Sequence, residues 1–576
     1  MGSFIFEKLS KPVFKFNGYM GYRIKANLQN WLLRAPKANP GMTEMFRLRD
    51  RQPKPDLVPW AGEFVGKYLI SAIQAIRMIE SEELVSLIQQ VMADMAGSQA
   101  EDGYLGPFTK GERLLGHWDL WGHYHWMLAF MMWHNDTGDK KTLDCVVKAA
   151  DLVCNIYLNT DKKVLDAGSH EMNMAVIHVL GWIYRETGQE RYFQMMQQIE
   201  KEWEQAGDYF RQGLDNVEFY KTPLPRWESL HDVQGLVELY QITGDERYKT
   251  AFENLWWSIQ KYDIHNTGGF TTGEKATGDP YAQGAIETCC TIAWMALSVD
   301  MLRLTGDPAV ADELELSTWN SMLGSQHPSG RWWTYDTPMN GVRPASAHSI
   351  VFQARHGTPE LNCCSVNGPR GLGMLSEWAA MTDDNGIVVN YYGPVESIIN
   401  FGDKQVKLLQ ETEYPVDGKI KITISPEQTG EFPVRLRIPE WSGNTIFRVN
   451  NESTQSAEPR SYAVIEREWK PGDQIELNLD MSLRYEDGKN ACEGLVSIYS
   501  GPLLMTYDQK FNDFDPDDVS VLKVPQDNIQ KIETEALFKP ITLLKAEAIN
   551  NQAVNLCDFA SAGAHGTHYR SWLPKS

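Results

Sequence analysis

The sequence predicts a mainly α-helical protein, an (α/α)6 toroid followed by β-sandwich domains. Two observations carry this prediction. A Thr-Gly-Asp or Thr-Gly-Gln turn recurs four times in the first part of the chain, each time after a stretch with helical periodicity. Beyond about residue 384, apolar and polar residues alternate with the period of two that half-buried strands show.

The four turns begin at Thr137, Thr187, Thr243 and Thr305, at spacings of 50, 56 and 62 residues. Glycine suits the left-handed position just past a helix C-terminus, and the following residues begin another helix. Each turn therefore predicts a helical hairpin, which can bury its apolar face only against other hairpins. Adding the helical segment from about Phe64 to Ala96, we expect five or six hairpins closed in a ring; an open helical solenoid is the alternative.

The second part of the chain contains strand-like segments that are separated by turn residues. Examples are residues 387–392, 419–424 and 434–439, with turns at 416–418 and 471–473. We therefore predict a toroid over residues 1–383, a β-sandwich over 384–490 and a smaller β domain over 491–576.

Composition and charge exclude several classes of partner. The 576 residues carry a formal net charge of −22, so nucleic acid is not expected as a partner, because its phosphates would be repelled. No apolar stretch reaches the roughly 20 residues of a membrane span. The first residues lack the apolar core of a signal peptide. Localisation stays open: periplasmic or secreted if a signal peptide was removed, otherwise cytoplasmic. The choice between monomer and homodimer stays open too.

Eight cysteines are too few and too unevenly spaced for a disulfide framework. Four of them form two adjacent pairs, Cys289-Cys290 and Cys363-Cys364. Glu287, Cys289, Cys363 and Cys364 together supply one carboxylate and three thiolates, a complete tetrahedral set for Zn²⁺. The alternatives are a closed zinc site that only ties two loops together, and simple buried free cysteines.

A glycine-rich segment, residues 268–274, lies thirteen residues before Glu287 and ends in Glu274. Glycine lets the backbone approach a ligand closely. Glu274 is therefore a candidate general acid/base, and the alternative is a loop carboxylate that faces solvent.

Together these motifs resemble glycoside hydrolase family 127, the β-L-arabinofuranosidase family. The resemblance rests on Gly-Gly…Gly-Glu, on Glu-x-Cys, and on Cys-Cys-x-x-Asn at residues 363–367. It extends through most of the chain, with similar segments at His170-Glu171, at His231-Asp232-Val233 and at residues 332–338.

The resemblance implies a toroid that holds the active site, with a glycan as substrate. It implies Zn²⁺ on Glu287, Cys289, Cys363 and Cys364. Cys363 would be the nucleophile and Glu274 the acid/base, while His170, His231 and Tyr335 would contact the sugar. Where the family often has His-Glu-Leu-Tyr, this chain has Trp-Asp-Leu-Trp at residues 118–121. Trp118 therefore replaces a sugar-contacting histidine, and both Trp118 and the nearby His125 are candidate substrate contacts.

These residue types suit a retaining reaction. Zinc binding removes the proton of a thiol, and the thiolate displaces a leaving group that Glu274 protonates. Water then hydrolyses the thioglycosyl intermediate while Glu274 acts as base. We expect an exo-acting glycosidase that releases terminal β-L-arabinofuranose or a related sugar from plant cell-wall glycans.

Two other functions stay open. One keeps the mechanism but takes an acidic branched pectin sugar such as aceric acid, whose carboxylate Arg331, Arg355 or Arg370 could bind. The other is a zinc-stabilised carbohydrate-binding protein without turnover, which would have no need of Glu274.

Overall fold

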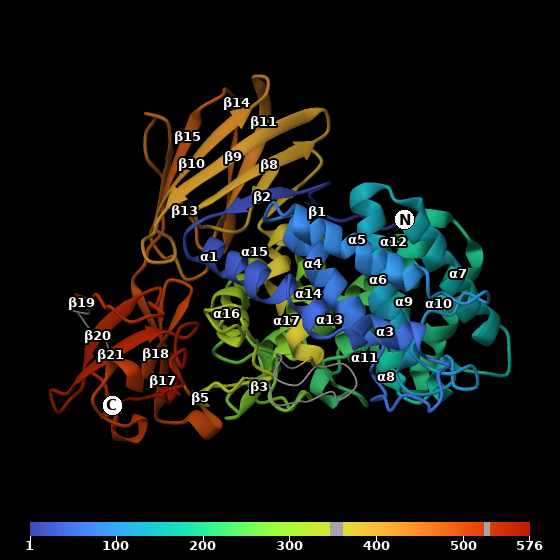
Figure 1. Cartoon of the computed structure of the whole chain (residues 1–576). Coiled ribbons are helices and arrows are strands. Elements are labelled where there is room, and N and C mark those ends of the chain that lie inside the picture. Colours follow the sequence, from blue (N-terminus) through green and yellow to red (C-terminus); the bar gives the residue numbers. More distant parts are fainter. Residues whose placement is uncertain (346–360, 524–529, 576) are drawn as a thin grey trace.

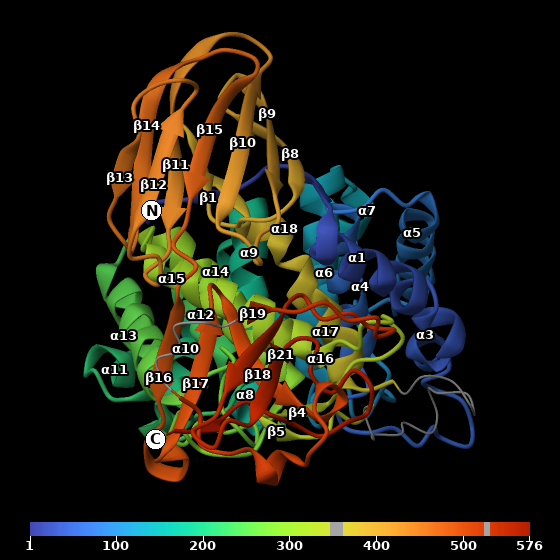
Figure 2. The ribbon, with the colours of Figure 1, turned by 90° about the vertical axis from the view of Figure 1, so that its left-hand side faces the viewer.

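The computed structural model describes residues 1–345, 361–523 and 530–575. A helical region occupies the right of Figure 1, a pair of sheets lies above it, and a C-terminal sheet lies beside it at the lower left. Figure 2, turned by 90°, brings the C-terminal sheet in front of the helices.

Within the described residues, six helices form a closed ring, because each contacts the next and the last contacts the first. In ring order they are α4 (Glu63–Ile76), α6 (Asp119–Thr137), α9 (Val176–Thr187), α12 (Ser229–Thr243), α14 (Thr288–Thr305) and α17 (Cys363–Gly373). The contact between α17 and α4 closes the ring. The predicted toroid is confirmed, and the open solenoid is excluded.

Five of these inner helices are each followed by an outer helix that packs against it. The outer helices are α5 (Glu82–Ala96), α7 (Lys140–Tyr157), α10 (Glu190–Glu202), α13 (Glu246–Asp263) and α15 (Pro308–Leu316). The sixth inner helix, α17, leads through α18 (Leu375–Trp378) into the sheets. Shorter helices precede the ring or lie in its connections: α1 (Gly18–Asn27), α2 (Ala35–Ala38), α3 (Gly41–Arg47), α8 (His170–Met174), α11 (Tyr209–Leu214) and α16 (Leu323–Ser325).

The predicted Thr-Gly turns end α6, α9, α12 and α14. Their glycines are the C-caps, with φ between 63° and 77°. Each turn threonine donates its hydroxyl to the carbonyl four residues earlier. The aspartates that follow three of these glycines cap the next helix through their side chains, whereas Gln189 does not. These bonds are all local, which explains why the turns are visible in the sequence.

The two sheets above the ring form the predicted sandwich. One has the order β1-β6-β7-β11-β14 and the other β13-β12-β15-β10-β9-β8-β2. Their strands are β1 (Glu7–Lys8), β2 (Val13–Phe16), β6 (Ala380–Thr382), β7 (Ile387–Val389), β8 (Val395–Phe401), β9 (Lys404–Thr412), β10 (Lys419–Pro426), β11 (Gly430–Ile438), β12 (Thr445–Val449), β13 (Gln455–Ala457), β14 (Ser461–Trp469) and β15 (Asp473–Asn478).

The C-terminal sheet has the order β16-β17-β18-β21-β20-β19, and β22, β23 and β5 are attached to it. Its strands are β5 (Asn340–Gly341), β16 (Leu483–Asp487), β17 (Leu495–Ser500), β18 (Leu503–Asp508), β19 (Gln530–Lys531), β20 (Leu543–Glu547), β21 (Ala553–Asp558), β22 (Tyr569–Arg570) and β23 (Leu573–Pro574).

Some strands lie on the other side of the predicted domain boundaries. Strands β1 and β2 belong to the sandwich, although we predicted residues 1–383 to be the toroid. Strand β16 lies before residue 490 but pairs with β17 in the C-terminal sheet. The pairings of β1 and β2 join residues far apart in the chain, so no local sequence pattern indicates them. The boundaries at 383 and 490 themselves stay predictions.

A buried ion-pair group, here called the Arg437 cluster, joins the sandwich to α15. Arg437 on β11 donates from Nη2 to Glu315 Oε1 at 2.6 Å and from Nη1 to Asp312. Its Nε donates to the carbonyl of Asn390 at 2.8 Å.

Among the described residues, no helix is long and apolar enough to cross a membrane.

Candidate active site

Two helix N-termini meet at one end of the ring and bring the predicted zinc ligands together. Glu287 ends β3 (Ala285–Glu287), which pairs with β4 (Asp336–Pro338). It is also the residue before α14, whose first turn contains Cys289. Cys363 and Cys364 open α17, whose N-cap Asn362 forms a capping box with Ser365. Because helix N-termini carry partial positive charge, both helices favour anionic groups here.

The predicted ligands form one group, here called the thiol cluster: Glu287, Cys289, Cys363 and Cys364. Its spacing is that of a tetrahedral site. One ligand atom from each lies within 4.8 Å of the others. The Sγ atoms of Cys364 and Cys289 are 3.6 Å apart, and those of Cys363 and Cys364 are 3.8 Å apart. A tetrahedron with Zn–S bonds of about 2.3 Å has edges of about 3.8 Å. Three thiols and a carboxylate at this spacing fit Zn²⁺.

The pKa values of the thiol cluster depend on one another, because its acidic groups are buried close together. Burial, followed by the charge of Cys363, raises the pKa of Glu287 well above its usual value. Burial alone would raise the pKa of Cys289, but hydrogen bonds from the Cys363 and Cys364 thiols lower it. The hydrogen bond to Cys289 in turn raises the pKa of Cys363. The four groups thus compete for negative charge, and a bound cation would let all of them ionise.

Glu274 lies close to this cluster and both of its carboxylate oxygens have partners. Its Oε1 accepts from the Tyr335 hydroxyl at 3.2 Å, and its Oε2 accepts from Arg226 Nη2 at 2.7 Å. Tyr335 immediately precedes β4, and its backbone carbonyl accepts from the Thr288 N–H at 2.9 Å. Burial first, and then the charges of Cys363 and Glu287, raise the pKa of Tyr335. Tyr335 therefore links Glu274 to the thiol cluster.

His231 and His125 line the interior of the ring. His231 Nδ1 lies 3.0 Å from Gln234 Oε1 and 3.1 Å from the Tyr124 hydroxyl, while its Nε2 is buried and has no hydrogen-bond partner among the described residues. Neither ring nitrogen of His125 has one either. Both imidazole rings pack against the Trp121 ring in T-shaped contacts. Burial lowers the pKa of both histidines, so they present neutral rings.

Two other predicted sugar contacts, Trp118 and His170, are more exposed than these histidines. Trp118 immediately precedes α6 and packs against Trp60, with ring centroids 5.2 Å apart. His170 is the first residue of α8 and is exposed. Within the described ranges, no hydrogen bond or ring contact joins His170 to the other candidates, although its neighbour Glu171 lies 3.6 Å from Arg226.

Sequence reasoning missed a buried ion pair beside the thiols. Lys67 Nζ lies 2.9 Å from Glu63 Oε2, and both side chains are almost fully buried. The ammonium lies over the rings of Trp121 and Trp227, at 5.3 and 5.1 Å from their centroids. The signal was a Glu and a Lys four residues apart inside an otherwise apolar helix. A solvated surface pair has the same pattern, so sequence alone could not select this one.

The arginines considered for an acidic sugar differ in position. Arg331 is exposed on a loop, and Arg355 lies outside the described residues. Arg370 is buried on α17, and its Nε and Nη1 have no hydrogen-bond partner in the described part of the chain. It lies seven residues after Cys363, about 10 Å further along the helix at 1.5 Å per residue.

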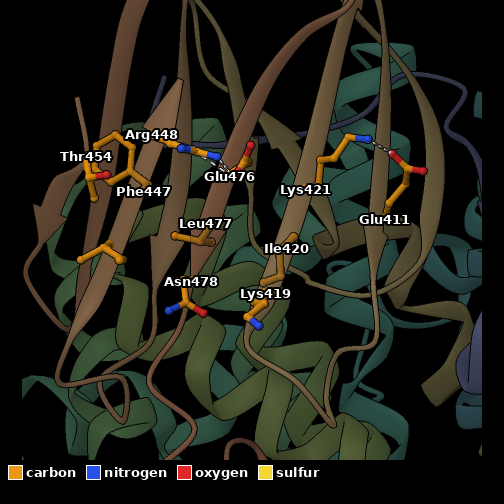
Figure 3. A pocket seen from close by; sticks show the side chains of 11 residues that line it. Glu411, Lys419, Ile420, Lys421, Phe447, Arg448, Thr454, Glu476, Leu477 and Asn478 are labelled. Carbon is orange, nitrogen blue, oxygen red and sulfur yellow. Dashed lines mark hydrogen bonds and ion pairs between the residues drawn. The ribbon is translucent and has the colours of Figure 1, made fainter. Parts of the chain in front are cut away.

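A separate hollow of about 480 Å³ lies on the seven-stranded sheet of the sandwich (Figure 3). Ion pairs cross it, from Arg448 to Glu476 and from Lys421 to Glu411. Its lining contains neither a thiol nor a histidine. This hollow therefore lacks the groups from which the thiol cluster is built.

Comparison with known proteins identifies the family to which the chain belongs. Residues 23–377 match the catalytic domain of glycoside hydrolase family 127 β-L-arabinofuranosidases, and residues 386–481 match the middle domain of that family. A family 127 β-L-arabinofuranosidase from Geobacillus stearothermophilus T6 has a similar structure, with 21% identity and a TM-score of 0.81 over 98% of this chain and 100% of that one.

A second structure, described as a family 127 β-arabinofuranosidase, has 20% identity and a TM-score of 0.81 over 100% of this chain and 98% of the other. Among curated proteins, none matches the sequence. At these identities the structural likeness shows the shared fold.

Proposed function

Since this chain belongs to glycoside hydrolase family 127, and is therefore a glycoside hydrolase that acts on a glycan, we propose that it is a zinc-dependent, retaining exo-glycosidase with Cys363 as nucleophile. The observation that carries the proposal is the convergence of three thiols and Glu287 at tetrahedral spacing, with Glu274 tied to them through Tyr335.

The zinc ligands we propose are Glu287, Cys289, Cys363 and Cys364. When bound, Zn²⁺ keeps the thiols deprotonated and holds them in place. Cys363 is the half-buried member of the cluster, whereas Glu287, Cys289 and Cys364 are buried. An attacking sulfur must reach the anomeric carbon, so its exposure supports the choice of Cys363.

Glu274 suits the role of acid/base because its carboxyl group lies near the cluster but is not one of the four ligands. In the first step it donates its proton to the leaving oxygen as the Cys363 sulfur bonds to the anomeric carbon. In the second step it takes a proton from the attacking water, and the C–S bond breaks. The two displacements together retain the anomeric configuration.

For the sugar we propose terminal β-L-arabinofuranose or a related neutral furanose from a plant cell-wall glycan. His231 and His125 would face it with neutral, partly unpaired rings. An acidic sugar would need a free cation near the cluster. Arg226 and Lys67 are already paired with carboxylates, and Arg370 lies two helical turns beyond Cys363.

The variant Glu274→Gln tests whether Glu274 acts as the acid/base while Cys363 acts as the nucleophile. It should keep zinc and fold but lose about 10²- to 10⁴-fold in turnover, the usual contribution of general acid–base catalysis. With an activated nitrophenyl β-L-arabinofuranoside, which needs little protonation, the first step should be less impaired. The sugar should then accumulate on Cys363, where intact-protein mass spectrometry and peptide mapping can detect it.

Glu253→Gln is a matched control, because the Glu253 side chain is 31% exposed and that of Glu274 is 35% exposed. Glu253 lies on the outer helix α13, so this variant should keep full activity. An adduct on a carboxylate, or a product of inverted anomeric configuration, would overturn the cysteine mechanism. Binding of arabinosides without any turnover would favour the carbohydrate-binding protein instead.

A further inference from the structure

Arg226 joins Glu274 to a carboxylate that the proposed reaction does not use. Its Nε donates to Glu228 Oε2 and its Nη2 to Glu228 Oε1, both at 3.0 Å. The same Nη2 donates to Glu274 Oε2 at 2.7 Å, and Glu171 Oε1 lies 3.6 Å from Nε. One guanidinium thus lies among three carboxylates.

Glu228 is the rigid end of this arrangement. It immediately precedes the inner helix α12 and is only 2% exposed, so the packing around it restricts its side chain. Two parallel hydrogen bonds to a guanidinium also fix the plane and direction of both groups. Arg226 is therefore anchored on a buried carboxylate at the start of an inner helix, while its Nη2 also donates to Glu274.

Glu274 needs such support because of where it lies. Both Gly273 and Glu274 have a positive φ, 69° and 68°, and they belong to a loop between α13 and β3. A side chain on a loop lacks the neighbours that restrict its rotamers on a helix or strand. Within the described ranges, two partners hold the carboxylate, Tyr335 at Oε1 and Arg226 at Oε2.

The backbone ties the same two segments together. The Trp227 N–H donates to the Glu274 carbonyl at 3.2 Å, and the Ala276 N–H donates to the Pro225 carbonyl at 2.8 Å. Arg226 and Lys275 form an antiparallel bridge between them. The loop that carries Glu274 is therefore fastened to residues 225–227 by main chain and by side chain.

From these contacts we infer that Arg226 is a positioning residue, which holds the carboxylate of Glu274 toward the thiol cluster and is itself anchored on the buried Glu228. This inference rests on the proposed role of Glu274. Arg226 acts through Glu274 and touches no reacting atom. A carboxylate displaced by about 1 Å can cost about 10²-fold in rate, so this support matters for both steps of the reaction.

The test is a double-mutant cycle between Arg226→Met and Glu274→Gln, in zinc-loaded full-length protein. The substrates are an alkyl and a nitrophenyl β-L-arabinofuranoside. We expect Arg226→Met to lower kcat on the alkyl glycoside by about 10²-fold, with little change in KM. The loss should be smaller on the nitrophenyl glycoside. In the Glu274→Gln background, Arg226→Met should have almost no further effect, because both changes remove the same function.

Two further variants control for folding. Arg226→Lys keeps the charge but cannot bind two carboxylates with one planar group, so its kcat should lie between those of wild type and Arg226→Met. Arg211→Met is the matched control, because Arg211 on α11 also contacts three carboxylates, Glu200, Glu204 and Asp208, at 2.8 to 3.0 Å. It should leave kcat and the leaving-group dependence unchanged.

The possible outcomes separate the two claims. If Glu274→Gln is impaired but Arg226→Met is not, or if their effects multiply, the positioning role of Arg226 is wrong and the proposed function stands. If Glu274→Gln is fully active on both substrates, the proposed function itself is wrong. An Arg226→Met variant that loses activity only through a raised KM would also contradict the inference, because it would indicate direct contact with the sugar.

Discussion

The thiol cluster and the Arg437 cluster are both buried groups of acidic side chains, but they differ in how their negative charge is balanced. In the Arg437 cluster, Glu315 accepts from Arg437, Tyr414 and Trp441, and Asp312 accepts from Arg437 and the Glu440 N–H. In the thiol cluster, the hydrogen bonds found in the described part of the chain come from other thiols and from Asn367.

The difference is what we expect if the Arg437 cluster serves the fold and the thiol cluster holds the proposed metal. A buried charge without a counter-charge is costly, so a cluster that serves only the fold contains its own cation. The Arg437 cluster does so, and it joins α15 to the sandwich. The charge of Lys67 favours ionised Cys289 and Cys363, but its ammonium is already paired with Glu63 at 2.9 Å. One paired ammonium does not balance four acidic groups, so the proposed Zn²⁺ would supply the remaining positive charge.

The largest expected effect breaks the thiol cluster. Cys289→Ala removes one of four ligands and should abolish both zinc binding and turnover, because the remaining three donors no longer complete the tetrahedral set. Metal analysis should find about one zinc per wild-type chain and almost none in the variant. Cys557→Ala is the control, since Cys557 is also buried but lies on β21 in the C-terminal sheet. Metal-free protein with full activity would falsify the proposed site.

The next effect breaks the Arg437 cluster. Arg437→Met leaves Asp312 and Glu315 without their counter-charge and should lower the free energy of unfolding by about 3–5 kcal/mol, the usual cost of breaking a buried ion pair from one side. Zinc content and the activity of the folded protein should not change. Arg448→Met, which removes the exposed pair with Glu476 in Figure 3, should cost about 1 kcal/mol or less. Equal losses in the two variants would remove the distinction between them.

The smallest expected effect is a dependence of the free energy of unfolding on pH, which arises from Glu228 beside the proposed active site. Burial raises the pKa of Glu228 from 4.5 to about 7, in spite of Arg226 beside it. Between pH 4.5 and 7, Glu228 therefore keeps its proton in the folded state but loses it in the unfolded state. The protonated carboxyl group of Glu228 contributes to the free energy of unfolding below pH 4.5, and this contribution, at most about 3 kcal/mol, is lost as the pH rises through 7.

Urea unfolding at several pH values between 5 and 8 measures this slope. Glu228→Gln should flatten it, because the variant has no proton to lose. Glu377→Gln is the control: the pKa of Glu377 is about 2, since Lys8 and Arg77 outweigh its burial, so Glu377 is ionised throughout this range. An unchanged slope in Glu228→Gln would contradict the assignment.

The sequence by itself determined the features that depend on neighbouring residues. The Thr-Gly-Asp turns end and begin helices through hydrogen bonds that span four residues or fewer, so their pattern survives in the sequence. Alternating apolar residues likewise predicted β10 and β11. The Glu-x-Cys and Cys-Cys motifs supplied donor types that suit a metal, and the family resemblance selected the four residues that the structure brings together.

Only the tertiary structure decided which distant residues meet. Strands β1 and β2 join sheets whose other strands lie more than 360 residues later, and the contact between α17 and α4 closes the ring. Arg226, Glu228 and the buried pair of Glu63 and Lys67 have sequence patterns that surface residues share. Their partners are selected by packing between elements remote in the chain, and no local hydrogen bond or periodicity records that packing.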